Sequence, residues 1–402
     1  MLDGVNVALG VCGSIAAVKT VELAHELRRR GADVRAVMTG GAQNIIHPWA
    51  VDFATDGDVV TELTGAVEHV ELCGREGWAD VFLIAPATAN TVGKVAGAVD
   101  DTPVTTCATT ALGADVPVVI APAMHEPMYD HPGVLDAIER VESWGVDFVD
   151  PRIEEGKAKI ASEERICLDT ARAAGARPLA GERVVVTTGA TAEEIDPVRV
   201  LTNRSSGKTG RAVAQACYVR GADVTLVHGV VGPHAPSNTA DEPALGPDGG
   251  LGYAEYRPVE SAAELRDATL DAAADADALV SAAAIGDYTV EASDSKLRSG
   301  QDLTLDLDAT PKVIDAVREA RPDLPIVGFK AETDGDDDAM VEAARATLDR
   351  VGLAFVVAND AGVMGAEDTR ALFVTDDGVD EFAGSKRGLA DGVADRLVSQ
   401  LD

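Results

Sequence analysis

The chain has 402 residues, 46% of them hydrophobic, which is enough to form two globular cores. Its 68 acidic and 34 basic side chains leave a net charge of −34, which excludes nucleic acids and anionic membrane surfaces as binding partners. Only nine of the basic side chains are lysine, a balance typical of proteins adapted to molar salt, where screening over about 3 Å removes the self-repulsion.

Cysteine usage and the N-terminus indicate where such a protein works. The five cysteines are widely spaced and include no C-x-x-C pair, so we predict neither a disulfide framework nor a zinc site. The N-terminal segment carries no basic leader, and no apolar run reaches the length of a membrane span. We therefore expect a soluble cytoplasmic protein.

The first half of the chain begins with a strand, a loop and a helix, predicted at residues 6–9, 10–17 and 20–30. The loop lacks the dinucleotide fingerprint G-x-G-x-x-G, but the N–H groups at the helix start and the Ser14 hydroxyl are suited to hold one phosphate. Two further apolar strands, at 81–84 and 116–120, each end in Ala-Pro. Polar loops thus follow the carboxyl ends of strands, where parallel sheets bind ligands.

The same pattern starts again in the second half, with a strand at 184–186, a polar loop and a helix opened by 207–210, and with later strands at 278–281, 326–329 and 354–357. The octet R-G-A-D-V-x-x-V begins at Arg30 and again at Arg220, and predicts a glycine helix cap followed by a buried strand. Pro178 ends the helix between the two halves. We therefore predict two α/β domains, 1–178 and 179–402.

The loop of the second half ends in N-R-S-S-G-K-T-G at 203–210. It contains G-K-T, but a Walker A loop needs glycine where Thr202 stands, so we exclude a P-loop NTPase. Its serines, Lys208 and the following helix start still offer donors to an anion. Residues 234–253 are rich in proline and glycine, and we interpret them as an inserted surface loop.

Five motifs give the first domain a family resemblance: G-V-C-G-S-I-A-A-V-K at 10–19, M-T-G-G at 38–41, E-H-V-E-L at 68–72, P-A-T-A-N-T at 86–91 and P-A-M-H-E-P-M-Y at 122–129. With them the domain resembles the flavin-dependent cysteine decarboxylases, which bind FMN. The resemblance implies a flavodoxin-like domain in which His69 is catalytic, and an imidazole is suited to remove a proton as hydride leaves for a flavin. The implied cofactor-binding residues are Gly10, Gly13, Ser14, Thr39, Thr88 and Asn90.

The second domain resembles phosphopantothenate-cysteine ligase through D-P-V-R-V-L-T-N-R-S-S-G-K-T-G at 196–210, A-A-A-I-G-D-Y at 282–288, G-F-K-A-E-T at 328–333 and A-N-D at 358–360. This resemblance implies CTP as co-substrate with Mg²⁺, and an acyl-nucleotide intermediate that Asn203 serves. The implied substrate- and nucleotide-binding residues are Arg199, Ser205, Ser206, Lys208, Asp287, Lys296 and Phe329.

In this order, the two halves resemble the bifunctional phosphopantothenoylcysteine decarboxylase/phosphopantothenate-cysteine ligases of coenzyme A synthesis. The resemblance implies a homo-oligomer, trimeric through the flavin domain and dimeric through the ligase domain, and the acidic composition adds an expected origin in a halophilic archaeon. Two alternatives stay open. One is an NAD(P)-dependent dehydrogenase of two Rossmann-like domains, and the other is a non-catalytic flavin-binding regulatory protein.

Three positions depart from the family pattern. His125 stands where the family has an asparagine that holds the departing carboxylate, and histidine can still donate a hydrogen bond. The usual cysteine clamp is replaced by E-E-G-K-A-K-I at 154–160, so we assign Lys157 to protonation of the enethiol intermediate. The helix before A-N-D lacks the family's lysine, which leaves triphosphate contact there to Arg345 or Arg350.

Overall fold

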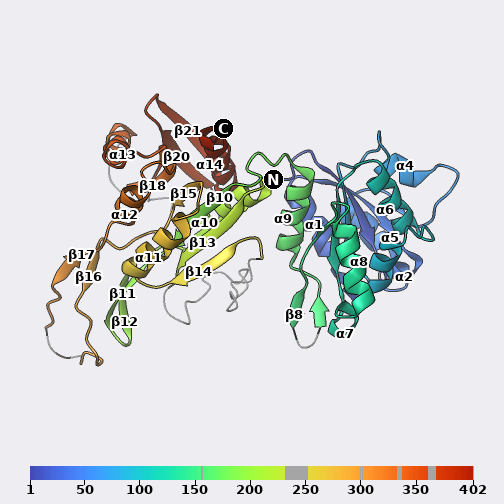
Figure 1. The fold of residues 1–402 in the computed structure, drawn as a ribbon, viewed down its shortest axis with the longest axis horizontal. Coiled ribbons are helices and arrows are strands. Elements are labelled where there is room, and N and C mark those ends of the chain that lie inside the picture. Colours follow the sequence, from blue (N-terminus) through green and yellow to red (C-terminus); the bar gives the residue numbers. More distant parts are fainter. Residues whose placement is uncertain are drawn as a thin grey trace. The chain divides into compact units, whose positions relative to one another are not determined.

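The computed structural model describes residues 1–154, 157–230, 252–298, 300, 302–332, 337–360 and 368–401. It divides into two compact units, Met1–Ala176 and Arg177–Asp402, each with its own sheet (Figure 1). The predicted α/β class with parallel sheets is confirmed. Nearly all of the predicted insertion at 234–253 lies outside the described residues.

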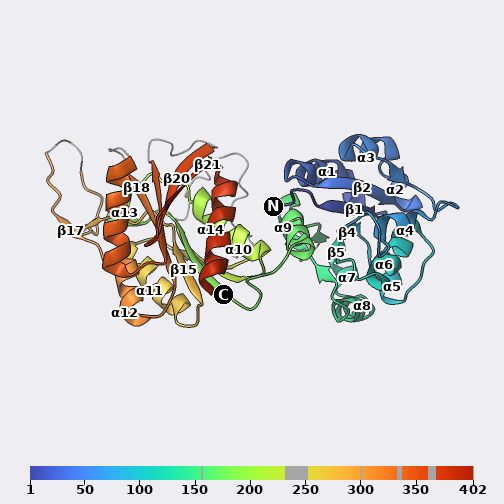
Figure 2. The same ribbon diagram turned by 90° about the horizontal axis from the view of Figure 1, so that it is seen from above.

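The first unit is a six-stranded parallel sheet between two layers of helices (Figure 2). In spatial order its strands are β3 (Val59–Val60), β2 (Asp33–Met38), β1 (Asn6–Val11), β4 (Val81–Ala87), β5 (Val118–Pro122) and β7 (Asp147–Phe148). The helices are η1 (Ile15–Lys19), α1 (Thr20–Arg29), α2 (Gly40–Gln43), α3 (Pro48–Thr55), α4 (Glu68–Cys73), α5 (Ala89–Ala96), α6 (Pro103–Gly113), α7 (Glu126–Tyr129), α8 (Pro132–Glu142) and α9 (Glu163–Ala174). A small antiparallel sheet joins β6 (Met124–His125), β9 (Lys157–Lys159) and β8 (Arg152–Glu154).

The second unit is an eight-stranded sheet in which the first five strand pairings are parallel and the last two are antiparallel. In spatial order its strands are β14 (Glu255–Val259), β13 (Asp223–Gly229), β10 (Arg183–Gly189), β15 (Ala278–Ser281), β18 (Ile326–Glu332), β19 (Phe355–Asp360), β20 (Asp368–Val374) and β21 (Val379–Ser385). Helices α10 (Lys208–Val219) and α14 (Lys386–Leu401) pack together on one face, and α11 (Ala262–Ala273), α12 (Val313–Ala320) and α13 (Asp337–Val351) cover the other (Figure 2). Two short pairs, β11 (Ala192–Asp196) with β12 (Arg199–Thr202) and β16 (Tyr288–Val290) with β17 (Leu307–Ala309), complete the unit.

The repeated R-G-A-D-V segment makes the same turn in both units. Gly31 follows α1 with φ +99°, and Gly221 follows α10 with φ +104°, a left-handed conformation that glycine adopts without steric cost. An added Cβ at Gly31 would also lie 2.8 Å from the Cα of Asp3. The predicted caps are therefore confirmed, and β2 and β13 follow them.

Strand order reverses once in each parallel sheet. The chain moves from β1 outward to β3 and then returns to β4 on the other side of β1, and it moves in the same way from β10 to β14 and back to β15. At such a reversal the two neighbouring loops separate to opposite faces and leave a crevice at the carboxyl ends of the strands. The fold thus predicts one ligand site after β1 and β4 and another after β10 and β15.

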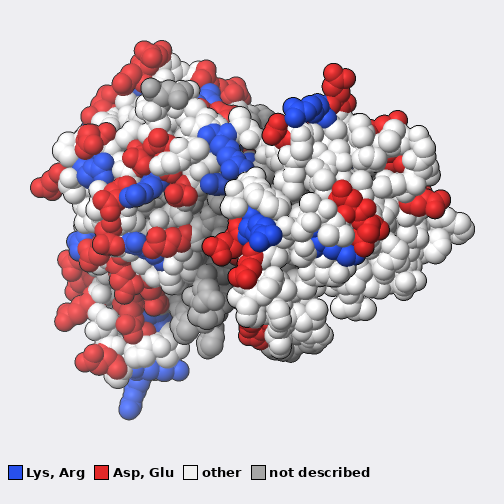
Figure 3. Space-filling view, turned by 45° about the vertical axis from the view of Figure 1, so that its right-hand side comes forward, with Lys and Arg blue, Asp and Glu red and all other residues white. Residues whose placement is uncertain are grey.

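Acidic side chains dominate the charged surface, with Asp and Glu spread over the face drawn in Figure 3. Because they repel one another at low ionic strength, we expect the protein to melt at a higher temperature in about 3 M KCl than in about 0.1 M KCl. Calorimetry in the two buffers measures this, and an equal melting temperature would contradict it.

Within the described ranges, no helix is long and apolar enough to span a membrane.

Candidate functional site

The first candidate site lies where the loops after β1, β4 and β5 meet. The Cys12 N–H donates to the Pro86 carbonyl (3.2 Å), and the Ser14 hydroxyl donates to the Ala123 carbonyl (3.0 Å). The Ala123 N–H donates to the Ala87 carbonyl (2.9 Å). These bonds bring the sequence-predicted loops together at the strand reversal of the first unit.

Three of the predicted cofactor-binding hydroxyls cap helices at this edge. Ser14 accepts an N–H of η1, Thr39 one of α2 and Thr88 one of α5. Gly13 packs so closely on the next loop that an added Cβ would lie 2.9 Å from the Gly41 carbonyl carbon. The two loops therefore form a narrow cradle of small residues, hydroxyls and helix starts, which suits a phosphate.

Two other predicted residues of this group are placed differently. Gly10 is buried inside β1, where an added Cβ would lie 3.0 Å from the Phe82 ring and 3.1 Å from Val104, so packing accounts for the glycine. Asn90 lies exposed on α5. Burial raises the pKa of the neighbouring Cys12 thiol to about 11 despite its hydrogen bonds with Thr91 and Thr88, so this thiol stays protonated at neutral pH.

The two predicted catalytic histidines lie on different elements. His69 is the second residue of α4, and its Nδ1 is buried with no hydrogen-bond partner among the described residues. A buried polar atom of this kind indicates a partner that the isolated chain does not supply. His125 is exposed at the end of β6, where its backbone pairs with that of Lys157 in β9, and the Lys157 side chain lies outside the described part.

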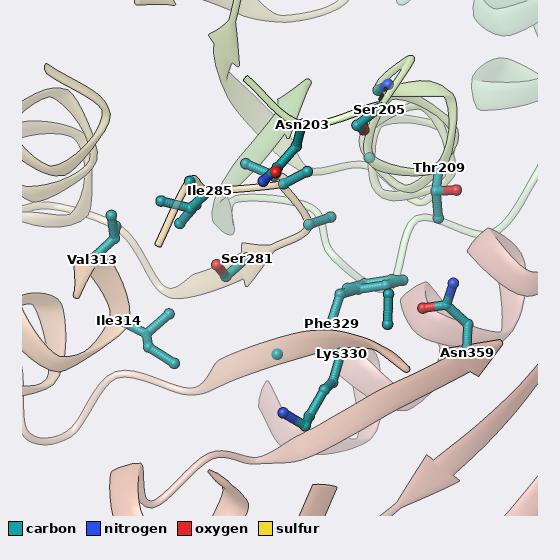
Figure 4. Close-up of a pocket in the computed structure, with 18 of the residues that line it drawn as sticks. Asn203, Ser205, Thr209, Ser281, Ile285, Val313, Ile314, Phe329, Lys330 and Asn359 are labelled. Atoms are coloured by element: carbon teal, nitrogen blue, oxygen red, sulfur yellow. Dashed lines mark hydrogen bonds between the residues drawn. The ribbon is translucent and has the colours of Figure 1, made fainter. Parts of the chain in front are cut away.

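The second candidate site is a cavity of about 610 Å³ at the strand reversal of the second unit (Figure 4). Its walls are residues 203–210 before and at the start of α10, residues 281–287 at the end of β15, residues 310–314 and residues 328–331 of β18. Figure 4 shows Asn203 and Phe329 on opposite sides of it.

Close backbone contacts hold the 203–210 loop over the end of β10. Gly207 has φ +69°, and its carbonyl accepts the Thr188 hydroxyl (2.8 Å). An added Cβ at Gly207 would lie 2.9 Å from the Gly189 nitrogen, and one at Gly210 would lie 2.4 Å from the Thr188 Oγ1. The glycines of S-S-G-K-T-G are therefore required for packing on the strand, which is a different role from that in a Walker A loop.

Six of the eight predicted ligase residues line this cavity: Asn203, Ser205, Ser206, Lys208, Asp287 and Phe329. Arg199 and Lys296 are not among its lining residues. Arg199 forms an ion pair with the buried Asp196, and its Nη2 donates to the Leu297 carbonyl (3.1 Å). The structure thus separates these two residues from the rest of the predicted group.

The Asp196 carboxylate explains why Arg199 is held. Burial raises its pKa, but the N–H groups of Leu297 (3.1 Å) and Val198 (2.8 Å) and the Arg199 guanidinium outweigh burial and keep the pKa below its usual range. Asp196 is therefore ionised at neutral pH, and it fastens β12 to the segment that carries Lys296.

Several cations of the cavity are absent from the sequence prediction. Lys312, Lys330 and Lys386 line it together with Lys208, so four of the nine lysines in the chain converge here. Arg204, also not predicted, and the predicted Arg350 add to them, whereas Asp287 is the one carboxylate among the described lining residues. The scarcity of lysine was the signal available in the sequence, because each lysine in so acidic a chain is a candidate anion ligand.

Two of these cations already have counter-ions. The Lys312 Nζ lies 2.8 Å from the Asp287 Oδ1, and the Arg350 Nη1 lies 2.7 Å from the Asp315 carboxylate. Of the two arginines predicted for triphosphate contact, Arg350 lines the cavity and Arg345 does not. The arrangement can neutralise a polyanion while presenting the Asn203 amide to it.

Comparison with known proteins agrees with this division of the chain. Residues 1–173 match the flavoprotein family, and residues 179–401 match the DNA/pantothenate metabolism flavoprotein C-terminal domain family. The coenzyme A biosynthesis bifunctional protein CoaBC of Thermococcus kodakarensis is 45% identical over 403 residues, which cover 100% of this chain and 96% of that protein. The chain belongs to the CoaBC family.

Other CoaBC proteins are similar over nearly the same span. That of Methanocaldococcus jannaschii is 32% identical and is covered to 94%, with 99% of this chain matched, and that of Bacillus subtilis is 34% identical and covered to 88%, with 91% matched. Membership of the CoaBC family confirms the predicted bifunctional enzyme of coenzyme A synthesis, and it favours neither the dehydrogenase nor the regulatory protein.

Proposed function

We propose that the second unit joins 4′-phosphopantothenate to cysteine through an acyl-cytidylate made with CTP, and that the first unit converts the product to 4′-phosphopantetheine with FMN. The observation that carries this proposal is the cation-lined cavity around Asn203 in a chain of net charge −34. CTP and 4′-phosphopantothenate are both polyanions, and such a cavity concentrates them against the field of the surrounding protein.

In the ligase unit, the cations offset the phosphate charge while the carboxylate of 4′-phosphopantothenate becomes activated. The Asn203 amide then donates a hydrogen bond to the acyl carbonyl oxygen as cysteine attacks, and stabilises the negative charge that develops there. Mg²⁺ is usually held by one or two carboxylates together with nucleotide phosphates, so Asp287 would be its protein ligand.

In the decarboxylase unit, the residues present fit FMN. The cradle between Gly13 and Gly41 would hold its phosphate with Ser14, Thr39 and Thr88. FMN held there would supply a reversible two-electron acceptor, which oxidises the cysteinyl group before CO₂ is lost and reduces the product afterwards.

The protein's own groups then move protons and hold the carboxylate. His69 removes a proton from the cysteinyl group, His125 donates a hydrogen bond to the departing carboxylate, and Lys157 protonates the enethiol intermediate. The exposure of His125 and the backbone pairing of its strand with β9 support its access to substrate.

We also infer that the chain forms homo-oligomers through both units. Large apolar side chains are exposed in the first unit at Trp49 (80%) and Phe53 (78%), and in the second at Val198 (66%) and Tyr288 (54%). Trp49 and Phe53 lie four residues apart on α3 and so share one face of that helix, and contiguous exposed apolar patches mark interaction surfaces. A trimer through the first unit and a dimer through the second would bury them.

Product analysis tests the proposed reactions. The full chain is incubated with 4′-phosphopantothenate, cysteine and CTP, and the products are identified by mass spectrometry. We expect CMP, pyrophosphate, CO₂ and 4′-phosphopantetheine, with no product when CTP is left out. Phosphopantothenoylcysteine without 4′-phosphopantetheine would contradict the decarboxylase half. The absence of both products would contradict the ligase half, and phosphopantothenoylcysteine supplied directly would then test the decarboxylase half.

The Gly13→Ala variant should lose flavin. Its new Cβ would lie 2.9 Å from the Gly41 carbonyl carbon, so the two loops of the cradle must separate. Overpacking of this kind costs about 1–3 kcal/mol, which weakens FMN binding by roughly 5- to 150-fold. Flavin absorbance per mole of purified protein and titration of the apoprotein with FMN measure the effect.

Gly40→Ala is the matched control, because an added Cβ there meets no atom within 4 Å. It should retain the flavin of the unchanged protein. Equal flavin in the two variants would show that the cradle does not hold the cofactor, and released FAD or NAD in place of FMN would refute the choice of cofactor.

A further inference from the structure

The cations of the ligase cavity come from two different sides. Lys208 begins α10 and follows the loop of Asn203, whereas Lys386 begins α14, far along the chain. Both line the same cavity because α14 packs against α10. Arg220 at the end of α10 fastens the two helices, since its guanidinium donates to Asp391 (3.0 Å) and Asp395 (2.8 Å) of α14.

Lys208 and Lys386 differ from Lys312 and Arg350 in their charge environment. Lys312 and Arg350 pair with carboxylates, but in the described part of the chain neither Lys208 nor Lys386 has a carboxylate partner. Both are half-buried. Burial lowers the pKa of Lys386, and the charge of Lys208 lowers it further.

Two half-buried ammonium groups that repel each other are costly unless an anion joins them. The chain has 68 carboxylates and places none between these two lysines within the described residues. Both lysines line the cavity, so an anionic ligand bound there can supply the opposite charge.

We propose that Lys386 and Lys208 together bind a phosphate group of a ligase substrate, which makes Lys386 a substrate-binding residue of this enzyme. This inference rests on the proposed ligase function. A phosphate monoester or a terminal phosphate carries close to two negative charges at neutral pH and so matches two ammonium groups, whereas a carboxylate carries one. Lysine is also a frequent phosphate ligand.

Two substrates carry such a group: CTP in its terminal phosphates and 4′-phosphopantothenate in its 4′-phosphate. The test measures dissociation constants of the full chain for CTP, CMP, 4′-phosphopantothenate and pantothenate at one salt concentration. Three variants are compared, namely Lys386→Met, Lys386→Arg and the control Lys94→Met. Lys94 pairs with Asp101 in the first unit, and Lys94→Met removes the same charge from the chain as Lys386→Met does.

We expect Lys386→Met to weaken the binding of one phosphate-bearing ligand by about tenfold or more. Lys386→Arg should retain most of the affinity of the unchanged protein. If the affinity for CTP falls while that for CMP is unchanged, Lys208 and Lys386 bind the terminal phosphates. If the affinity for 4′-phosphopantothenate falls while that for pantothenate is unchanged, the two lysines bind the 4′-phosphate. Lys94→Met should match the unchanged protein with all four ligands.

Two results would overturn the inference. Affinities of Lys386→Met equal to those of the unchanged protein would show that the lysine binds no substrate. An equal loss for all four ligands would show that it supports the fold alone. If the unchanged protein binds neither CTP nor 4′-phosphopantothenate, the proposed ligase function itself fails, and the two failures are thereby distinguished.

Discussion

The Asn203→Asp variant is expected to release pyrophosphate and to accumulate the acyl-cytidylate, while forming almost no phosphopantothenoylcysteine. Asn203 lines the cavity beside Ser205 and Lys208, so its amide can reach the acyl carbonyl oxygen as that oxygen gains negative charge. A donor in such a position contributes about 3 to 4 kcal/mol to the transition state. Aspartate removes the donor and adds a repelling charge.

Activation by CTP should suffer less, because it relies on the metal and on cations that this substitution leaves in place. Pyrophosphate release and product mass, followed in the same reaction, measure the two half-reactions. Asn44→Asp, at an exposed position of the first unit, adds the same charge and should leave both unchanged. If pyrophosphate release falls as far as product formation, Asn203 serves activation or folding.

The His69→Asn variant is expected to stop CO₂ release while phosphopantothenoylcysteine accumulates. Loss of a general base lowers the rate by roughly 10² to 10⁴-fold. The ligase should continue, because the described residues that line its cavity all belong to the second unit. CO₂ evolution and the mass of accumulated product measure the two activities separately.

The control for this variant is His131→Asn in the same unit. His131 is exposed and caps α8 through its ring nitrogen, a role that asparagine also performs well, so both activities should persist. Loss of both activities in a folded His69→Asn protein would mean that the units depend on each other.

Much of the fold is predictable from short stretches of sequence, because it rests on interactions between residues close together in the chain. The apolar run at 184–186 lies inside β10, and Gly31 and Gly221 adopt the left-handed turn that R-G-A-D-V predicts. The loops after β1, β4 and β10 lie at the carboxyl edges of their sheets, as predicted. Strands that alternate with helices pair in parallel, so their carboxyl ends and the loops that follow them meet at one edge of the sheet.

The composition of the sites depends instead on contacts between distant segments. Sequence motifs predict Arg199 as a substrate-binding residue, and only the folded chain shows that its guanidinium pairs with the buried Asp196. Gly10 looked like part of a phosphate loop, but it is required by the packing of Phe82. The local sequence pattern could not determine the role of either residue. The role of a charged or small residue depends on which neighbours the folded chain brings into contact with it.

Lys386 shows the same limit most clearly. No motif joins it to Lys208, and only the packing of α14 on α10 places both ammonium groups on one cavity. Length, charge, the two α/β halves and the loop around Asn203 can be read from the sequence, because each depends on composition or on neighbours in the chain. The cluster of cations depends on tertiary contacts, because the energy of a charge is set by burial and by the charges that surround it in space.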